Sequence, residues 1–263
     1  MLTSWFAFKT PLPTPAKVVL ALVAWTLLLG IWQLIPTLNP KLATLCPPPT
    51  HVVDTLHHLL TEKDYLNDIL QSLIRVATSF GLAILVALPL GILMGAFPVI
   101  EGFLNPIVSP FRYLPAPSFI PLLLAWLGTG DEQKIALLFI GVIWFLISLY
   151  MDDAKRVPAE LIESARTLGA SRPQVLLRVI VPCALPALLD STRQMLAVSW
   201  TYLVIAEIVA STDGIGAVMM RAKRFVRMDI ILAGILTIGV LGFTSDAALR
   251  ALRHLAFPYL RKN

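Results

Sequence analysis

Long stretches without charged residues limit the fold of this chain more than any other feature. Residues 18–40 and 76–100 contain no Lys, Arg, Asp or Glu, and each is longer than the roughly 20 residues that a helix needs to cross a bilayer. Further apolar windows are 113–130, 135–151, 230–245 and, interrupted by Asp190 and Arg193, 185–205. We therefore predict an all-α, polytopic membrane protein with six transmembrane helices.

The composition indicates that most of the chain is surrounded by lipid. Of the 263 residues, 57% are hydrophobic and 14% are charged, whereas soluble domains carry about 25% charged residues. This excludes a disordered chain and disfavours a water-soluble enzyme. The net charge of +5 comes from basic residues scattered between apolar runs, so we expect no nucleic-acid partner. Cys46 and Cys183 lack the spacing of metal ligands, and we expect no metal site.

The distribution of Lys and Arg predicts which loops face the cytoplasm. With a cytoplasmic N-terminus, the inner segments hold thirteen of the 21 basic residues, in keeping with the positive-inside rule. In the outer loop we expect a surface helix from Thr50, as its N-cap, to Glu62. The predicted order is a cytoplasmic segment 1–17, an uncleaved first span 18–40, an outer loop 41–68, a transmembrane core 69–252 and a cytoplasmic tail 253–263.

One long inner loop, residues 152–184, carries the pattern of two short helices. Pro158 suits the first turn of the first helix, in which Leu161, Ala165 and Leu168 form an apolar stripe. Gly169 follows as the residue that ends this helix.

The second helix of this loop begins at Ser171, because Gln174 three residues later completes a capping-box pattern. We expect it to end near Ile180, with Pro182 and Pro186 separating it from the next span. Such a helix pair either rests in the lipid interface or provides a docking site for a soluble partner. The pattern alone leaves both alternatives open.

The inner loop also carries a family signature. Glu163-Ser164-Ala165, Gly169 and, nine residues later, the segment 179–182 (Val-Ile-Val-Pro) resemble the motif E-A-A-x3-G-x9-I-x-L-P. That motif marks permease subunits of binding-protein-dependent ABC importers. The chain departs from it at Ser164, Val179 and Val181, all by small or aliphatic replacements.

Three further strings resemble one branch of these importers. Residues 72–76 are similar to an S-L-x-R-V string, and Ala206-Glu207 with residues 214–216 is similar to an A-E…G-[IL]-G segment. Arg112-Tyr113-Leu114-Pro115, followed by Pro121-Leu122 and Trp126-Leu127-Gly128, resembles the pattern of the third span. Together they indicate the nitrate, sulfonate, taurine and bicarbonate branch.

The resemblance implies a permease fold of the type I importer kind, in the bacterial inner membrane, with both termini cytoplasmic. It implies a pair of permease subunits, a periplasmic solute-binding protein as partner, and a small anion as solute. We expect the pair to be a homodimer, because this chain needs no special partner to complete a two-fold. Cytoplasmic ATPase subunits would bind ATP and Mg²⁺ and dock on the inner loop. The residues implied in this coupling are Glu163, Ser164, Ala165, Gly169, Val179 and Pro182.

Several catalytic motifs are missing from the sequence. It contains no G-x-x-x-x-G-K-[ST] phosphate-binding loop and no H-E-x-x-H zinc motif. We therefore expect no enzyme activity and no cofactor in this chain, with ATP hydrolysis performed by another polypeptide. An integral membrane enzyme and a structural membrane protein remain the alternatives.

Polar residues inside the spans are candidates for the translocation path. They are Asn105 and Ser109 early in the third span, Ser199, Thr201 and Tyr202 in the fifth, and Glu207 at the outer end of the fifth. Ser and Thr often bond their own helix backbone instead, and a structural hydrogen bond is the first interpretation for Glu207.

Charged and small residues in the spans give three structural expectations. We expect Arg75 to extend towards the headgroups at the outer start of the second span. Asp190 and Arg193, three residues apart, are expected to form an ion pair. Gly91 and Gly95 are expected at a close helix crossing.

Four basic residues lie in a segment expected outside: Arg221, Lys223, Arg224 and Arg227. On a helix, Lys223, Arg224 and Arg227 would share one side. Three explanations remain open: contact with lipid headgroups, docking of an acidic face of the binding protein, or attraction of an anionic solute to the outer mouth.

Overall fold

Every regular element is a helix in the part of the chain that the structure, a computed structural model, describes: residues 12–39, 44–209 and 212–258. This confirms the all-α prediction. The order is α1 (Thr14–Leu38), α3 (Pro49–Thr61), α4 (Lys63–Ala96), α5 (Pro98–Phe111), the 3₁₀ turn η2 (Ala116–Phe119), α6 (Ile120–Leu127), α7 (Asp131–Lys155), α8 (Ala159–Thr167), α9 (Arg172–Val175), the π-helix η3 (Leu176–Ile180), α10 (Val181–Ile208), α11 (Ile215–Arg224) and α12 (Met228–Ala256).

Five helices within the described ranges are long and apolar enough to cross a bilayer: α1, α4, α7, the continuous helix Arg172–Ile208 and α12. The prediction of a single third helix over 113–130 is wrong. The chain there forms a bent pair, in which α5 and the segment Ala116–Leu127 meet at 85°. Pro115 and Pro117 lie at the bend, and proline cannot donate the backbone hydrogen bond that would continue a helix. Six crossings result if the bent pair counts as one.

Two other helices begin at residues that differ from the predicted ones. α4 begins at Lys63, well before Val76, because the polar residues of its first turns find partners in neighbouring elements. The outer surface helix begins at Pro49, and Pro48 rather than Thr50 is its N-cap residue. The reason is that Pro49 has the fixed φ angle that suits the first helical position.

Pro182 and Pro186 do not end the second helix of the inner loop, which is a further correction. α9, η3 and α10 form one continuous helix. In the π-helical turn the Val181 N–H donates to the Leu176 carbonyl, five residues back. This wider turn accommodates the ring of Pro182, which in a regular α-helix would clash with the carbonyl four residues earlier.

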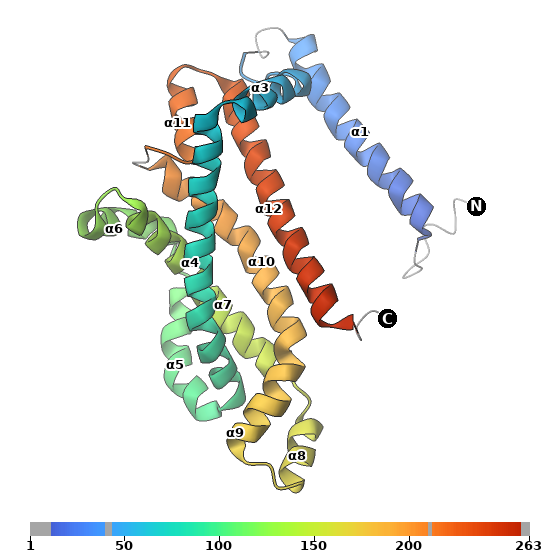
Figure 1. Ribbon diagram of the computed structural model, residues 1–263, viewed down its shortest axis with the longest axis vertical. Coiled ribbons are helices and arrows are strands. Elements are labelled where there is room, and N and C mark those ends of the chain that lie inside the picture. Colours follow the sequence, from blue (N-terminus) through green and yellow to red (C-terminus); the bar gives the residue numbers. More distant parts are fainter. Residues whose placement is uncertain (1–11, 40–43, 210–211, 259–263) are drawn as a thin grey trace.

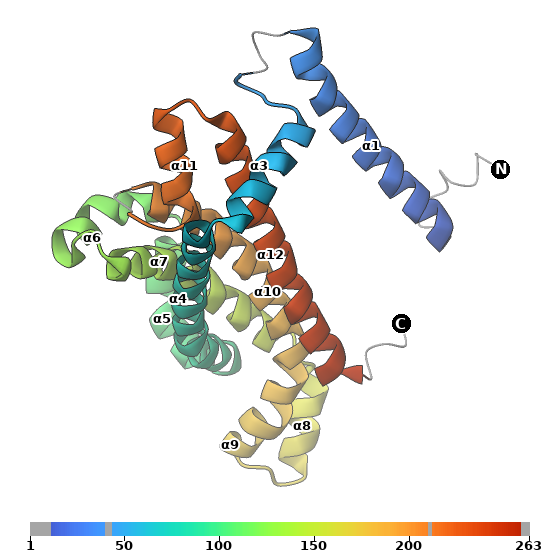
Figure 2. The same cartoon turned by 45° about the horizontal axis from the view of Figure 1, so that its top comes forward.

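α4, α7, α10 and α12 form the body of the molecule (Figures 1 and 2). Fully buried leucines such as Leu137, Leu146 and Leu203 fill its core. α4 crosses α7 closely at Gly91 and Gly95. A Cβ on Gly91 would lie 2.5 Å from Tyr150 Cβ, and a Cβ on Gly95 would lie 2.5 Å from the Met151 carbonyl. The predicted close crossing is confirmed.

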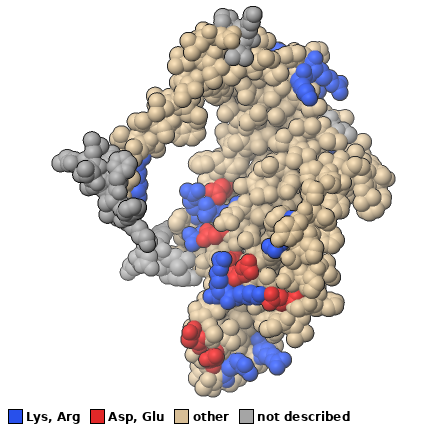
Figure 3. Space-filling model, turned by 180° about the vertical axis from the view of Figure 1, so that it is seen from behind, with Lys and Arg blue, Asp and Glu red and all other residues tan. Residues whose placement is uncertain are grey.

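α1 stands apart from this body. None of its most apolar window is buried, and the space-filling view shows open space between α1 and the other helices (Figure 3). Its C-terminal half is held by the Trp32 Nε1–H, which donates to the Pro47 carbonyl at 3.0 Å. Helices α8 and α9 lie at one end of the molecule, and α3 and α11 lie at the other (Figure 1).

Candidate functional site

The inner loop presents the signature residues on α8. This helix contains no buried residue, and Glu163 and Ser164 are exposed on it. Ala165 is half-buried and packs against the core. Val179, in the π-helix, also packs against the core, whereas Pro182 is exposed. The signature therefore has an outward part on α8 and an inward part that joins the loop to the bundle.

The apolar stripe of α8 differs from the predicted one. Ile162 and Ala165 pack against the core, whereas the side chains of Leu161 and Leu168 are 47% and 88% exposed. Leu168 is the C-cap residue, and its backbone is no longer helical. It therefore no longer lies on the face that Leu161 and Ala165 would define.

The turn between α8 and α9 is fixed by its backbone. Gly169 has a φ of +85°, a left-handed conformation that favours glycine. The Gly169 N–H donates to the Arg166 carbonyl at 2.9 Å, and the Ala170 N–H donates to the Ala165 carbonyl at 3.0 Å, which is a Schellman motif. The Ser171 N–H then donates to Gln174 Oε1 at 2.8 Å. Both predicted caps are confirmed, and they set the angle between the two short helices.

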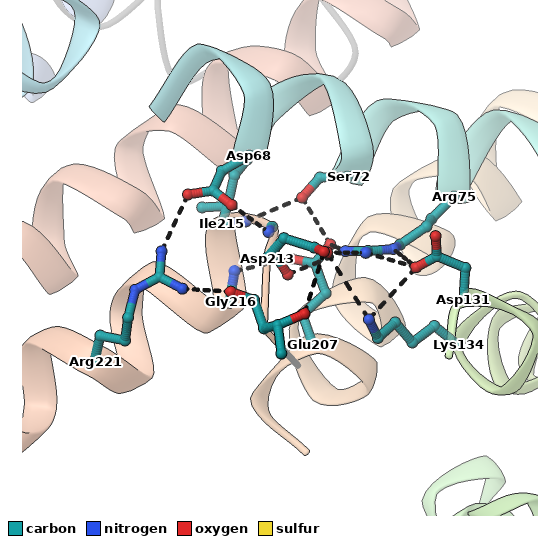
Figure 4. Close-up of polar contacts among 12 residues, drawn as sticks. Asp68, Ser72, Arg75, Asp131, Lys134, Glu207, Asp213, Ile215, Gly216 and Arg221 are labelled. Atoms are coloured by element: carbon teal, nitrogen blue, oxygen red, sulfur yellow. Dashed lines mark hydrogen bonds and ion pairs between the residues drawn. The ribbon is translucent and has the colours of Figure 1, made fainter. Parts of the chain in front are cut away.

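A buried arginine of α4, Arg75, lies next to the start of α11, on the side of the molecule away from α8 and α9 (Figure 1), and Figure 4 shows its polar contacts. The Arg75 side chain is 1% exposed, so the expectation that it reaches the headgroups is wrong. Its Nη1 donates to Glu207 Oε1 at 2.7 Å, its Nε donates to Asp131 Oδ1 at 2.7 Å, and its Nη2 contacts the Asp213 carboxylate. Three carboxylates compensate the buried charge, and burial would otherwise be too costly.

Glu207 is the fully buried partner in this group. Besides the bond from Arg75, its carboxylate accepts the Ser72 hydroxyl at 2.7 Å and the Gly216 N–H at 2.8 Å. The predicted structural role of Glu207 as a hydrogen-bond acceptor is confirmed by these contacts. Charge-assisted bonds of this kind are about twice as strong as neutral ones.

The same residues cap the beginning of α11. The Gly214 N–H donates to Asp68 Oδ1 at 2.6 Å, and the Ile215 N–H donates to Ser72 Oγ at 3.0 Å. With the bond from Gly216 to Glu207, side chains of α4 and α10 satisfy N–H groups that a helix start leaves free. Gly214 has a φ of +96°, and a Cβ there would overlap the Glu207 carboxylate. We name Asp68, Ser72, Arg75, Asp131, Lys134, Glu207, Asp213 and the start of α11 the outer clamp.

The outer clamp unites two of the strings noted in the sequence. Ser72 and Arg75 come from residues 72–76, and Glu207 and Gly216 come from the segments at 206–207 and 214–216. Sequence reasoning missed Asp68, Asp131, Lys134 and Asp213, because a charged residue outside the apolar windows gives no pairing signal of its own. The sequence did give a signal that Arg75 and Glu207 are partners. Both are charged residues at the edge of apolar windows, where such residues usually form ion pairs.

The contacts of the clamp change the pKa of Asp213, which lies in the loop before α11. The hydrogen bond from Arg75 lowers the pKa of the Asp213 carboxyl below its usual value, and partial burial opposes this shift. The buried Lys134, whose Nζ lies 3.4 Å from Asp131 Oδ1, adds a further positive charge nearby. Asp213 therefore stays ionised at neutral pH. The contacts of the clamp fasten α4, α7, α10 and α11 together.

The basic residues 221–227 do not share one side of a helix, contrary to the prediction. α11 ends at Arg224, and Val226 has a φ of +57°, so Arg227 lies beyond the turn. Arg221 pairs with Asp68 at 3.1 Å, and Arg227 pairs with Asp229 at 2.7 Å. Two of the four charges thus have acidic partners, and Lys223 and Arg224 remain exposed at the end of α11.

The predicted path residues are not gathered into one site. Asn105 and Ser109 line an open hollow along α5, and Thr201 is exposed and bonds the Ala197 carbonyl at 3.3 Å. Ser199 is buried, and its Oγ has no hydrogen-bond partner among the described residues. Tyr202 packs against Gly141, and Glu207 belongs to the outer clamp. Their role in a path stays a prediction.

Charged residues of α10 and α12 form ion pairs. Asp190 and Arg193 lie 3.3 Å apart, as predicted. Arg193 also pairs with Asp246 at 2.9 Å, and Arg253 pairs with Asp190 at 2.9 Å. On the face of the molecule seen in Figure 3, basic and acidic side chains lie next to one another in the lower half. Among the described residues, no three His, Cys, Asp or Glu side chains are grouped as metal ligands would be.

Comparison with known proteins gives matches along most of the chain. Residues 87–255 match the family described as "Binding-protein-dependent transport system inner membrane component". The taurine transport system permease protein TauC of Escherichia coli is 33% identical over 94% of this chain and 92% of its own length. The nitrate import permease protein NrtB of Synechocystis is 28% identical over 94% and 92%, respectively. A putative aliphatic sulfonates transport permease protein, SsuC of Bacillus subtilis, is 32% identical over 86% and 82%.

Solved structures support the same fold. A chain of the MetNI methionine ABC transporter, in an inward-facing conformation, matches with a TM-score of 0.59 and 21% identity, covering 71% of this chain and 94% of that one. A bacterial ABC transporter involved in the import of the acidic polysaccharide alginate matches with a TM-score of 0.56 and 20% identity, covering 90% and 96%. At these identities the likeness concerns the fold alone.

Proposed function

The chain belongs to the family of binding-protein-dependent transport system inner membrane components, and from this premise we propose that it carries a small anion of the sulfonate or nitrate kind. It is a permease subunit of an ABC importer in the nitrate, sulfonate and taurine branch, and a transport subunit rather than an enzyme. The named relatives support this class of solute, since their solutes share one negative charge on a small oxyanion group.

In this proposal, an ATPase subunit that binds ATP and Mg²⁺ docks on the inner loop. The observation that carries the proposal is α8, a helix without buried residues on which Glu163 and Ser164 are exposed. The Schellman turn at Gly169 holds α8 rigidly to α9, so a displacement of α8 is passed to the continuous helix Arg172–Ile208. A rigid connection is what coupling to a separate ATPase requires.

The proposal also gives the remaining partners and the orientation. A periplasmic binding protein delivers the solute at the end that carries the outer clamp, and a second copy of this chain completes the importer. The inner loop and both termini face the cytoplasm of the bacterial cell. This orientation is supported by Figure 1, in which α1 begins and α12 ends towards the end that carries α8 and α9.

Uptake into proteoliposomes tests the proposal. The chain is reconstituted with its ATPase and binding protein, and ATP-dependent uptake of labelled taurine, an alkanesulfonate and nitrate is measured. We expect uptake of at least one of these anions, and its loss in Gly169→Val and Glu163→Lys. Valine is strained at a φ of +85°, and lysine reverses a charge on the exposed face of α8.

Gly30→Val provides the matched control. Gly30 lies within α1, and a Cβ there would meet nothing within 4 Å, so the same substitution should leave uptake unchanged. If Gly169→Val and Glu163→Lys both support uptake and solute-stimulated ATP hydrolysis at the wild-type rate, the inner loop is not the coupling element.

A further inference from the structure

We propose that a cavity between the inner loop and the base of α4 binds a small anionic amphiphile, a single negative head group on a short alkyl chain. The cavity measures about 180 Å³. It lies where the loop meets the bundle, since Phe97 joins α4 to α5 and the other lining residues come from α8, the turn, α9 and the π-helix. Its lining consists of Phe97, Ile162, Arg166, Ala170, Arg172, Val175, Leu176 and Ile180.

The wall of the cavity is apolar. Val175 and Ile180 are buried, and Ile162, Ala170 and Leu176 are half-buried and pack against the core. The π-helix contributes both its first and its last residue, Leu176 and Ile180, to this wall. Pockets that enclose drug-sized ligands measure roughly 300–1,000 Å³. This smaller cavity therefore suits a few carbon atoms rather than a complete acyl chain.

Two arginines give the cavity its charge. Arg166 is in the last turn of α8, and Arg172 is the first residue of α9. Neither guanidinium makes a hydrogen bond or ion pair with any described residue, and no carboxylate is among the lining residues. Guanidinium groups bind sulfonate, phosphate and carboxylate oxygens by paired N–H bonds. Arg172 also begins the continuous helix Arg172–Ile208, whose N-terminus adds positive potential.

Free arginines above an apolar recess recognise one chemistry, a negative head group attached to an alkyl segment. Two sources can supply it at this end of the molecule: the head group and first carbon atoms of an anionic phospholipid of the adjacent leaflet, or a soluble alkyl anion. In either case the occupant ties the turn at Ala170 to Phe97 at the base of α4. Binding requires neither the ATPase nor transport, so it can be tested on this chain alone.

Binding of butanesulfonate tests the inference. The purified full chain is placed in nanodiscs of phosphatidylcholine, and equilibrium dialysis with labelled butanesulfonate measures its Kd. We expect saturable binding to the wild type, and a Kd about tenfold or more higher in the double variant Arg166→Gln/Arg172→Gln. Ala170→Phe, which fills the recess and keeps both arginines, should also abolish binding.

Arg178→Gln is the matched control, because Arg178 is exposed on the same helix but does not line the cavity. It should bind butanesulfonate as the wild type does. Nanodiscs that contain phosphatidylglycerol identify the source: competition with butanesulfonate indicates a lipid occupant, and unchanged binding indicates a soluble anion. Equal affinity in the wild type, the double variant and Ala170→Phe would overturn the inference, as would an equal loss in Arg178→Gln.

Discussion

Replacing Glu207 by Gln should destabilise the protein far more than replacing Asp131, another carboxylate of the outer clamp, by Asn. The Glu207 side chain is 0% exposed, whereas that of Asp131 is 52% exposed. In wild type, one oxygen of Glu207 accepts from Arg75 and Ser72, and the other accepts from the Gly216 N–H. An amide has only one oxygen, so in either orientation its NH₂ group faces another donor.

The magnitude follows from these contacts. Leaving a buried charge without its partner costs about 3–5 kcal/mol, but Arg75 retains Asp131 and Asp213, which lowers the loss. A buried donor left without an acceptor adds about 1–3 kcal/mol. We expect Glu207→Gln to lower the free energy of unfolding by about 3 kcal/mol in total. For Asp131→Asn we expect no more than about 1 kcal/mol, because exposed pairs are screened by solvent.

Titration with sodium dodecyl sulfate in mixed micelles, followed by tryptophan fluorescence, measures both unfolding free energies. Asp131→Asn serves as the matched control, since it removes a charge from the same arginine. If the two variants lose the same stability within about 0.5 kcal/mol, burial is not what makes Glu207 important, and the account of the clamp given above is refuted.

Three further predictions concern pH, packing and charge. Arg75 lowers the pKa of Asp213 below 3.8, so Asp213 stabilises the fold above that pH and ceases to do so as the pH falls through the lowered pKa. The Asp213→Asn variant should therefore lose less unfolding free energy on acidification than the wild type does. An identical pH dependence of the two proteins would contradict this. Gly95→Ala should destabilise by about 1–3 kcal/mol in the same titration because its Cβ would overlap α7, whereas Gly239→Ala, with open space around it, should not. Lys223→Gln/Arg224→Gln should raise the half-saturation concentration for anion uptake at low salt and less at high salt, since exposed charges act over about 8 Å at physiological ionic strength; an unchanged value at low salt would limit these residues to contact with lipid.

The spans could be predicted from the sequence because burial in lipid leaves a direct record in composition. Charge-free windows located α1, α7 and α12 closely, and cap residues located the turn at Gly169. The prediction of one helix over the third window was wrong because hydropathy carries no information on the direction of the chain. The same apolar residues suit a straight helix or a bent pair of helices, and only the prolines near residue 115 indicated the break. Pro182 and Pro186 led to the opposite error, the prediction of a helix end where the helix continues. A π-helical turn accommodates a proline that would end a regular helix.

The outer clamp was predictable only in part. Arg75 and Glu207 each stood out as charges beside apolar windows. More than a hundred residues separate them in the sequence, however, and no local sequence pattern indicates that their side chains form an ion pair. Asp131 and Asp213 join them through tertiary packing of α7 and the loop before α11. The prediction that Lys223, Arg224 and Arg227 lie on one helix was wrong because the chain turns at Val226, which has a positive φ. Such a conformation is unusual for a β-branched residue, so the sequence gives no sign of the turn.

The length of α4 and its two attachments to α7 together determine how these helices can move. The 34 residues of α4 form a rod about 51 Å long at about 1.5 Å per residue. The rod is fastened to α7 at two distant points, by the glycine crossing near one end and by the Arg75–Asp131 bond towards the other. A beam held to its neighbour at two points can neither swivel nor slide along it. α4 and α7 therefore tilt as a single lever, and a tilt of about 10° about one end carries the other end through about 9 Å.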